Sequence, residues 1–437
     1  MRRLYVAGPS RSLPQLRTHY RLSYPLPATF RSCRIESVVS TRRTTNLRAL
    51  DRRALAAVAA QFFVNGALPA SFIPRLPEIR DQVDISVAEI GLLVSLAGLA
   101  GLVGSATVGR VVERFGTRQV MIGAGIVIST SLAVIGFATT PVVLLVGLAG
   151  MMGFDVLVDV SMNMQASWLS ARRHAPVMNR LHGLWSLGTV VGGLGAAWAA
   201  AADVSIQTHL VGAAIVLSMV LVFVARGVLR SDETHELADG RSPAATARMG
   251  SNSILVLFLL AGVFAVALEY TASDWAAFRL VDDFAAGAGF AGLGYIAATG
   301  GMTIGRMSGD WAVVRLGTYR LLLVAIGLSG LGLATAALAP NRYVTLGGFL
   351  VAGIGTSTML PRLYDDAAKL PGRPGAGLGA LTAGVRIAVL AFPVIIGTLA
   401  DTNLSVGSAI AIATLPCVAG FLLIARTLHR AGVALSD

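Results

Sequence analysis

The sequence predicts an all-α integral membrane protein with twelve transmembrane helices. Hydrophobic residues make up 55% of the 437 positions and charged residues 13%, with a mean hydropathy of +0.71, whereas a soluble chain carries about twice that charged fraction. Twelve apolar stretches, most of them 20 or more residues long, run from residue 54 to residue 426, and about 20 apolar residues suffice to cross the hydrocarbon layer. The longest polar break, 230–252, is too short for a separate domain, since domains begin near ~50 residues.

The polar breaks and the prolines set the expected helices. The first half is expected to span the membrane at 54–72, 86–108, 120–138, 142–169, 181–202 and 208–229. The second half is expected to span it at 253–278, 284–305, 319–338, 343–363, 375–400 and 404–425. Pro74 and Pro77 close the first helix, and Pro141, Pro340 and Pro371 precede later ones, because proline suits the start of a helix and not its interior.

This pattern divides the chain into five parts. A basic, disordered arm is expected at 1–50, an N-terminal bundle at 51–229, a cytoplasmic linker at 230–252, a C-terminal bundle at 253–430 and a tail at 431–437. The arm is rich in Arg and Ser and poor in acids, which is also the composition of an organellar transit peptide. We favour a disordered arm, or translated sequence upstream of the true start, over that alternative.

The placement of the positive charges predicts the topology. The net charge is +12, and of the 35 Lys and Arg residues 18 fall in alternate loops or the tail, against four in the opposite loops. Cytoplasmic loops carry such an excess, so both termini are expected in the cytoplasm of a cell-membrane protein. The charge then reflects topology and contact with membrane lipid, and no nucleic-acid partner is expected. Cys33 and Cys417 lie far apart in sequence, which argues against a disulfide framework or a cysteine metal site.

The chain also repeats itself. Arg114-Phe-Gly-Thr117 recurs as Arg315-Leu-Gly-Thr318, 201 residues later and again just before the third helix of a half. Two six-helix halves of this kind are an architecture of secondary transporters, whose substrate site lies between the repeats near the midplane.

The loop that contains the first copy resembles a known family. Gly109-Arg-Val-Val-Glu-Arg-Phe-Gly-Thr-Arg118 is similar to the cytoplasmic loop 2–3 signature of the major facilitator superfamily, with Glu113 in place of the usual Asp. The second copy, from Gly305 to Gly317, carries an insertion. The resemblance covers about residues 54–430 and implies a monomeric transporter that is not an enzyme. It also assigns a gating role to Gly109, Glu113, Arg114, Gly116, Arg118, Gly305, Asp310, Arg315 and Gly317.

Finer features resemble the YbjJ-type, fucose-permease-like bacterial branch. They are Asn65-Gly66, Pro74-Arg-Leu-Pro77, His182-Gly-Leu-Trp-Ser186, and Glu269 followed by Asp274-Trp275. In the loops, Gly109 and Gly116 permit a tight backbone reversal. Glu113 is expected to pair with Arg114, Arg118 or a helix end as a latch that opens when the halves rock. The alternative is that these arginines only obey the topology rule.

Ionisable residues inside the spans are the candidates for function. Asp155, Asp159 and Asn163 recur every fourth residue, so they lie on one stripe of the fourth helix. Lipid does not tolerate such a stripe, which is therefore expected to face the protein interior or a wet cavity. Further candidates for the substrate cavity are Gln61, Asn65, Asp274, Thr356, Ser357, Thr382 and Arg386. The resemblance implies that Asn65, Asp155, Asp159 and Glu269 surround one space, because helices 1, 4, 7 and 10 line the central cavity of the superfamily fold.

A charge count predicts proton coupling. Asp155, Asp159 and Glu269 are three acids against one base, Arg386, which we expect to be the counter-ion of Glu269. An arginine stays protonated under nearly any condition, so at least two acids must be hydrated or carry a proton. We therefore expect Asp155, Asp159 and Glu269 to couple transport to the proton gradient, without a cofactor. The alternative is a static polar network that fixes helix 4 to its neighbours.

These observations favour a secondary active transporter that moves a small organic solute by alternating access. Uptake of a polar, sugar-like solute by proton symport is preferred, and efflux of a drug or metabolite by proton antiport is the alternative. Arg386, if unpaired, would favour an anionic substrate. A remote alternative is an intramembrane enzyme that binds Mg²⁺ through Asp155 and Asp159, but the sequence has no second acidic motif suited to face it.

Overall fold

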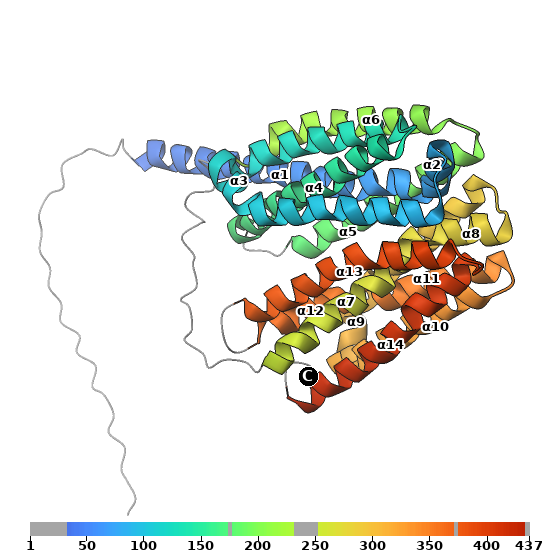
Figure 1. Cartoon of the computed structure of the whole chain (residues 1–437). Helices are drawn as coiled ribbons and strands as arrows, with labels where there is room; N and C mark the ends of the chain where they lie inside the picture. Colours follow the sequence, from blue (N-terminus) through green and yellow to red (C-terminus); the bar gives the residue numbers. More distant parts are fainter. Residues whose placement is uncertain (1–32, 174–176, 231–251, 371–374, 433–437) are drawn as a thin grey trace, which may run out of the picture. The chain divides into compact units, whose positions relative to one another are not determined.

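The computed structural model describes residues 33–173, 177–230, 252–370 and 375–432 (Figure 1). The chain divides into two units, Met1–Ala49 and Leu50–Asp437, and the helical bundle is the second of these units. All secondary structure in the described ranges is helical. Helix α1 begins at Cys33, so the predicted arm is helical from that residue onward. The rest of the arm, linker residues 231–251 and the tail from residue 433 lie outside the described residues.

Two series of helices follow each other along the chain. The N-terminal half contains α1 (Cys33–Phe72), η1 (Ile73–Arg75), α2 (Leu76–Val83), α3 (Val87–Gly136), α4 (Pro141–Arg173), α5 (Met178–Ala201) and α6 (Ile206–Gly227). The C-terminal half contains α7 (Asn252–Asp274), α8 (Ala276–Phe284), α9 (Ala288–Leu316), α10 (Thr318–Leu338), α11 (Arg342–Thr356), α12 (Met359–Ala368), α13 (Ala376–Ala400) and α14 (Val406–Arg430).

Ten helices of the described residues are long and apolar enough to span a membrane. The difference from the predicted twelve has two causes. Helix α3 has 50 residues, or about 75 Å, and covers the second and third predicted spans, which a non-helical turn at Gly116 separates. Helix α9 corresponds to the eighth predicted span and is not among the ten, since Arg306 and seven glycines between Gly289 and Gly309 lower its hydropathy.

Backbone conformation repeats between the halves at the same spacing as the sequence. Gly116 and Gly317 have φ values of 76° and 72°, and Asp84 and Ala285 have values of 58° and 48°. Each pair is 201 residues apart. Positive φ costs a residue with a Cβ about 1–2 kcal/mol, so glycine suits the two turns that follow α3's first segment and α9. The two halves are therefore structural repeats.

Two predicted spans are broken rather than continuous. The seventh breaks at Trp275 into α7 and α8, and the tenth breaks after Thr356 into α11 and α12. The first span ends at Phe72 as predicted, and the short helices η1 and α2 follow it. Broken helices leave backbone groups without helical partners, and transporters place them where they line a cavity or a passage.

The short helices α2 and α8 tie down other helices at one end of the bundle (Figure 1). Gln82 of α2 donates to the carbonyls of Gly136 and Ala138 at 3.3 and 2.6 Å. Arg279 of α8 donates to those of Ala336 and Ala339 at 3.2 and 2.9 Å. The two side chains thus satisfy the last carbonyls of α3 and α10, which have no partner within their own helices.

Two seams join the halves near this end, which we call the α2–α8 end. In the first seam α5 packs on α9, where Gly292 lies against Ala197 and Gly193 against Tyr295. In the second seam α3 packs on α13, where Gly98 lies against Leu390. Small residues let helix backbones approach closely inside a membrane. From this end α3 and α9 run toward Gly116 and Gly317, which define the Gly116–Gly317 end.

Candidate functional site

An acid of the N-terminal half, Asp155, is the last acceptor of a hydrogen-bonded chain that links α5, α1 and α4. Asn65 on α1 donates from Nδ2 to Oδ1 of Asp155 on α4 at 2.7 Å. Nε1 of Trp185 on α5 in turn donates to Oδ1 of Asn65 at 3.0 Å. Asn65 is 4% exposed, and both ends of its amide are engaged. The amide therefore fixes the position of Asp155 relative to α5.

The rest of the helix 4 stripe is more open. Asp159 is exposed, and Asn163 one turn further donates to its carboxylate at 3.1 Å and to its backbone carbonyl at 2.8 Å. Neither Asp155 nor Asp159 has an ion-pair partner within 4.0 Å in the described part of the chain. Gln61 is 1% exposed, and its Oε1 lacks a hydrogen-bond donor there.

The acid of the C-terminal half pairs with a cation that sequence reasoning assigned to a loop. Oε1 of Glu269 on α7 lies 3.6 Å from Nη2 of Arg306, and the two side chains are 11% and 28% exposed. Arg306 is not in a loop but within α9. It also donates from Nη1 to Oγ of Ser186 at 3.4 Å, and its guanidinium lies 5.5 Å from the centre of the Trp185 ring. The side chain therefore reaches from the C-terminal half to α5 of the N-terminal half.

The expected pairing of Arg386 with Glu269 is wrong in this structure. Arg386 on α13 donates from Nη2 to Oγ of Ser105 on α3 at 2.6 Å, and its Nε has no hydrogen-bond partner among the residues that the structure describes. Its charge lies close enough to act on Asp155 and Asp159. The arginine thus faces the acids of the opposite half, and Glu269 is left to Arg306.

Tyr270 lies among the charges of both halves, and sequence reasoning missed it. Its neighbours include Glu269 and Asp274 on α7, Asp155 on α4 and Arg386 on α13. The side chain is 43% exposed, and it is influenced by charges from both halves. Its position directly after Glu269 was the available signal, but adjacent helical residues point in directions about 100° apart, and the sequence alone did not place both in one space.

Two of the predicted cavity hydroxyls, those of Thr356 and Ser357, bond to carbonyls of the preceding turn instead. Thr356 and Ser357 are 0% and 1% exposed, and they donate to the carbonyls of Gly353 and Ile354 at 3.2 and 2.7 Å. Thr382 is half-buried one turn before Arg386. Asp274 accepts a hydrogen bond from Ser273 at 2.6 Å. The predicted position of Thr356 and Ser357 at the cavity surface is wrong for this conformation, because both hydroxyls are buried at the break between α11 and α12.

Comparison with known proteins agrees with this arrangement. The sequence model of the Major Facilitator Superfamily matches residues 55–377. The chain belongs to the major facilitator superfamily. An uncharacterized MFS-type transporter of Yersinia pestis is 26% identical over 373 residues, which is 85% of this chain and 93% of the relative. Membrane protein MosC of Rhizobium meliloti is 26% identical over 318 residues, 72% of this chain and 76% of MosC.

Solved structures show that the superfamily fold is shared. The nucleoside transporter NupG superposes with a TM-score of 0.64 at 10% identity, over 87% of this chain and 98% of NupG. A bacterial homolog of the human lysosomal transporter Spinster superposes with a TM-score of 0.59 at 14% identity, over 89% and 97% of the two chains. This MFS protein is therefore a membrane transporter and not an enzyme, which excludes the reading of Asp155 and Asp159 as a catalytic Mg²⁺ motif.

The superfamily loop motif is only partly arranged as expected. Gly116 and Gly317 form the predicted turns, whereas Gly109 and Gly305 lie inside α3 and α9. Gly305 packs against Ser357 and Ile354. Seven positions separate Gly109 from Gly116, whereas the insertion makes it twelve between Gly305 and Gly317, so Gly305 lies further from its turn than Gly109 does.

The predicted Glu113 latch is absent in this conformation. Glu113 is exposed, and no ion pair within 4.0 Å involves it in the described residues. Arg118 instead donates to the carbonyl of Ala225 at 2.9 Å, and Arg114 and Arg315 lie over the neighbouring rings of Phe115 and Trp311. The side chain of Asp310 lies outside the described residues.

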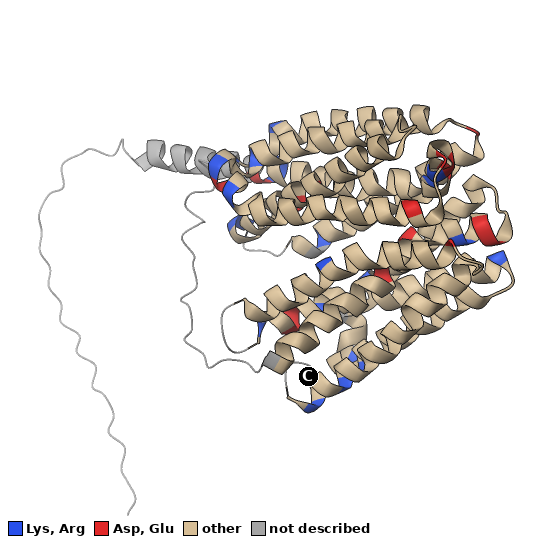
Figure 2. Cartoon of the chain, viewed as in Figure 1, with Lys and Arg blue, Asp and Glu red and all other residues tan. Residues whose placement is uncertain are grey.

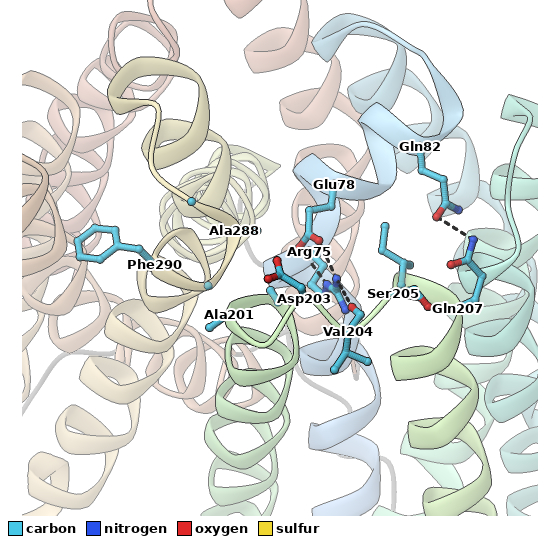
Figure 3. Close-up of a pocket in the computed structure, with 14 residues that line it drawn as sticks. Arg75, Glu78, Gln82, Ala201, Asp203, Val204, Ser205, Gln207, Ala288 and Phe290 are labelled. Carbon is cyan, nitrogen blue, oxygen red and sulfur yellow. Dashed lines mark hydrogen bonds and ion pairs between the residues drawn. The ribbon is translucent and has the colours of Figure 1, made fainter.

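A cavity of about 600 Å³ opens at the α2–α8 end and not at the acids (Figure 3). It lies between the segment from Arg75 to Gln82, the connection 203–207 and the start of α9. Within it Arg75 pairs with Glu78 at 2.7 Å and donates to the carbonyl of Val204 at 2.9 Å. None of the predicted site residues lines this cavity, which belongs to the junction of the halves.

Proposed function

We propose that this MFS protein is a proton-coupled secondary transporter of the cell membrane, and that it moves a small polar solute through the space between its halves by alternating access. The observation that carries the proposal is the group of charges around Tyr270. The charges of Asp155 of one half, and of Glu269, Asp274 and Arg386 of the other, all act on this side chain. Charged groups at bilayer depth are costly and mark transport pathways.

Twelve membrane crossings, with both termini in the cytoplasm, form the proposed topology. The turn at Gly116 divides the 50 residues of α3 into two segments that can each cross a bilayer of ~30 Å. Figure 2 shows many of the blue Lys and Arg positions at the helix ends away from α2 and α8. Positive loops favour the cytoplasm, so the Gly116–Gly317 end is assigned to that side and the α2–α8 end to the outside.

In this frame the structure corresponds to a state that is closed outside. Nη1 of Arg80 on α2 donates to Oδ2 of Asp282 on α8 at 2.7 Å, across the two halves. An outer end that is held closed is the arrangement expected for release into the cytoplasm.

Protons are the proposed driving ion because the acids outnumber the arginines. Asp155 and Asp159 have no ion-pair partner within 4.0 Å in the described residues. A proton on either group removes a charge that is expensive to enclose. It also allows the halves to close around the solute before the proton is released on the other side. Uptake by symport of a polar, sugar-like solute is the first candidate.

Proton antiport of a cationic solute is the second candidate, and one observation favours it. The four acids Asp155, Asp159, Glu269 and Asp274 face two arginines. If all ionise, two carboxylates need compensation, by two protons or by a bound cation. A solute with an amine could then displace a proton, which is the exchange that drives efflux.

Proteoliposomes that contain a pH-sensitive dye distinguish these candidates. Sugars, polyols, carboxylates and amines are added outside one at a time. A symported solute acidifies the lumen, an antiported one makes it alkaline, and both responses disappear with a protonophore. The protein with Asp155→Asn and Asp159→Asn is the control. Solute uptake without any proton movement, or the same proton movement in the double variant, would refute the proposed coupling.

A further inference from the structure

Two arginines of the C-terminal half cross to serines of the N-terminal half. Arg306 on α9 donates to Ser186 on α5, and Arg386 on α13 donates to Ser105 on α3. These are the same two helix pairs whose small residues form the seams at the α2–α8 end. Each seam therefore contains one arginine–serine contact. This contact lies further from the α2–α8 end than the close packing at Gly292 in the first seam and at Gly98 in the second.

Each crossing arginine also has an acidic neighbour. Arg306 lies 3.6 Å from Glu269 of its own half. Arg386 lies beside Gly101 of α3, which also lies against Met152 of α4, about one turn before Asp155, and its charge acts on Asp155 and Asp159 of the other half. A guanidinium has five N–H donors in a rigid fork. The whole group occupies one position at a time, so it moves toward the serine or the acid, whichever attracts it more strongly.

The observed distances show that the two arginines bind their serines with different strengths. Arg386 has a short bond of 2.6 Å to Ser105, whose own hydroxyl donates to the carbonyl of Gly101 at 2.9 Å and so leaves its lone pairs for the arginine. Arg306 lies 3.4 Å from Ser186 and 3.6 Å from Glu269. Both separations exceed the usual 2.7–2.9 Å of a charge-assisted bond, so Arg306 is divided between its serine and its acid.

We infer that Arg306 and Arg386 are positioning residues that transmit the protonation of the cavity acids to the two seams. An ionised acid draws its arginine away from the serine and loosens the seam. A protonated acid releases the arginine to the serine across the seam, which stabilises the state closed at the α2–α8 end. This inference rests on the proposed function, and it explains how proton binding from outside would favour opening toward the cytoplasm.

Other titratable groups face the same residues and must be separated from them. Asp274 and Tyr270 lie near Glu269 on the same helix, and Tyr270 also faces Asp155 and Arg386. From α5, His182 lies near Arg306 and packs edge-on against Phe62. His182→Gln and Asp274→Asn are therefore included as separate arms of the test.

The experiment measures the distance between the halves and needs no solute. Spin labels are placed at Gln119 and Arg320, which are exposed, 201 residues apart and located just after the two glycine turns. Cys33 and Cys417 are first replaced by serine. Pulsed electron spin resonance in nanodiscs then gives the ratio of the long- and short-distance populations in acidic and in mildly alkaline buffer.

In the wild type the long-distance population should increase on acidification by about tenfold, the effect expected of one hydrogen bond to a charged group. Arg306→Ala and Arg386→Ala should each reduce this response to less than half. Glu269→Gln should keep Arg306 bonded to Ser186 at both pH values, as in the wild type in acidic buffer. Ser105→Ala should reduce the response as much as Arg386→Ala does, and Ser105→Thr should retain it, because only threonine keeps the hydroxyl that Arg386 contacts. Arg342→Ala removes an exposed arginine within one half and should respond like the wild type.

The outcomes separate this inference from the proposed function. A wild-type response that persists unchanged in both arginine variants and in Ser105→Ala overturns the inference, while proton movement in the dye assay still supports coupled transport. A response lost only in His182→Gln or Asp274→Asn overturns it as well, since the switch would then lie elsewhere. If an arginine variant does not fold, the Ser105 pair tests the same contact with a smaller change.

Discussion

Asp282→Asn should shift the transporter toward its outward-open state. The Arg80–Asp282 contact joins α2 to α8 at 2.7 Å, and the two side chains are 12% and 22% exposed. Exposed ion pairs contribute about 0.2–1 kcal/mol, and hydrogen bonds to charged groups contribute about 1.5–3 kcal/mol. Because Arg80 keeps Asp81 as a partner at 2.8 Å, no arginine is left without a carboxylate. The expected loss is therefore about 1–2 kcal/mol, or a factor of about 5–30 in the ratio of the two states.

The assay uses spin labels at Val142 and Tyr343, which are 70% and 61% exposed at the starts of α4 and α11. Their separation should increase in Asp282→Asn, with the population of the longer distance rising by the factor above. Asp81→Asn is the matched control, since it removes the other partner of Arg80 within the same half. An unchanged distance in Asp282→Asn, or an equal shift in Asp81→Asn, would show that the contact across the halves does not hold this end closed.

Three further predictions concern coupling and stability. The variant with both Asp155→Asn and Asp159→Asn should fold and yet lose solute-driven proton movement in the dye assay; full concentrative transport would remove helix 4 from the mechanism. Gly116→Ala should lower the thermal stability by about 1–2 kcal/mol, because φ is 76° there, whereas Gly109→Ala, which is helical with open space around it, should raise it by up to about 1 kcal/mol; equal effects would contradict the turn. Arg279→Gln should cost about 3 kcal/mol or more, since Asp283 would keep a buried charge without its arginine; a melting temperature within error of the wild type would exclude this role.

Much of the fold was predictable because membranes restrict it strongly. Every backbone polar group in the bilayer needs a partner within the protein, so apolar runs of sufficient length have to be helices. The first span ends at Phe72, the ninth at Leu338 and the eleventh at Ala400, as expected. The break after Thr356 was not predicted, because Ser357 and Thr358 are compatible with a helix and only packing decides their conformation.

The candidate site was predictable in its acids but not in its cations. Asp155 and Asp159 stood out because two carboxylates one turn apart cannot face lipid. Arg306 was assigned to a loop by alignment with Arg110, but the insertion before Gly317 places it five positions deeper, or about 7.5 Å along the helix. Counting back from Gly317 instead of from the start of the motif would have placed it correctly. The partners of Arg386 and Tyr270 depend on how the halves face each other, and a single sequence does not specify that.

The arginine–serine contacts between the halves also show that the two halves, although their backbones repeat, supply different side chains. Along both seams the guanidinium comes from the C-terminal half and the hydroxyl from the N-terminal half. Two N-terminal halves brought together would lack the guanidinium groups that these serines accept from, and two C-terminal halves would place like charges against each other. The repeated halves thus share a backbone arrangement but carry complementary side chains at these two contacts.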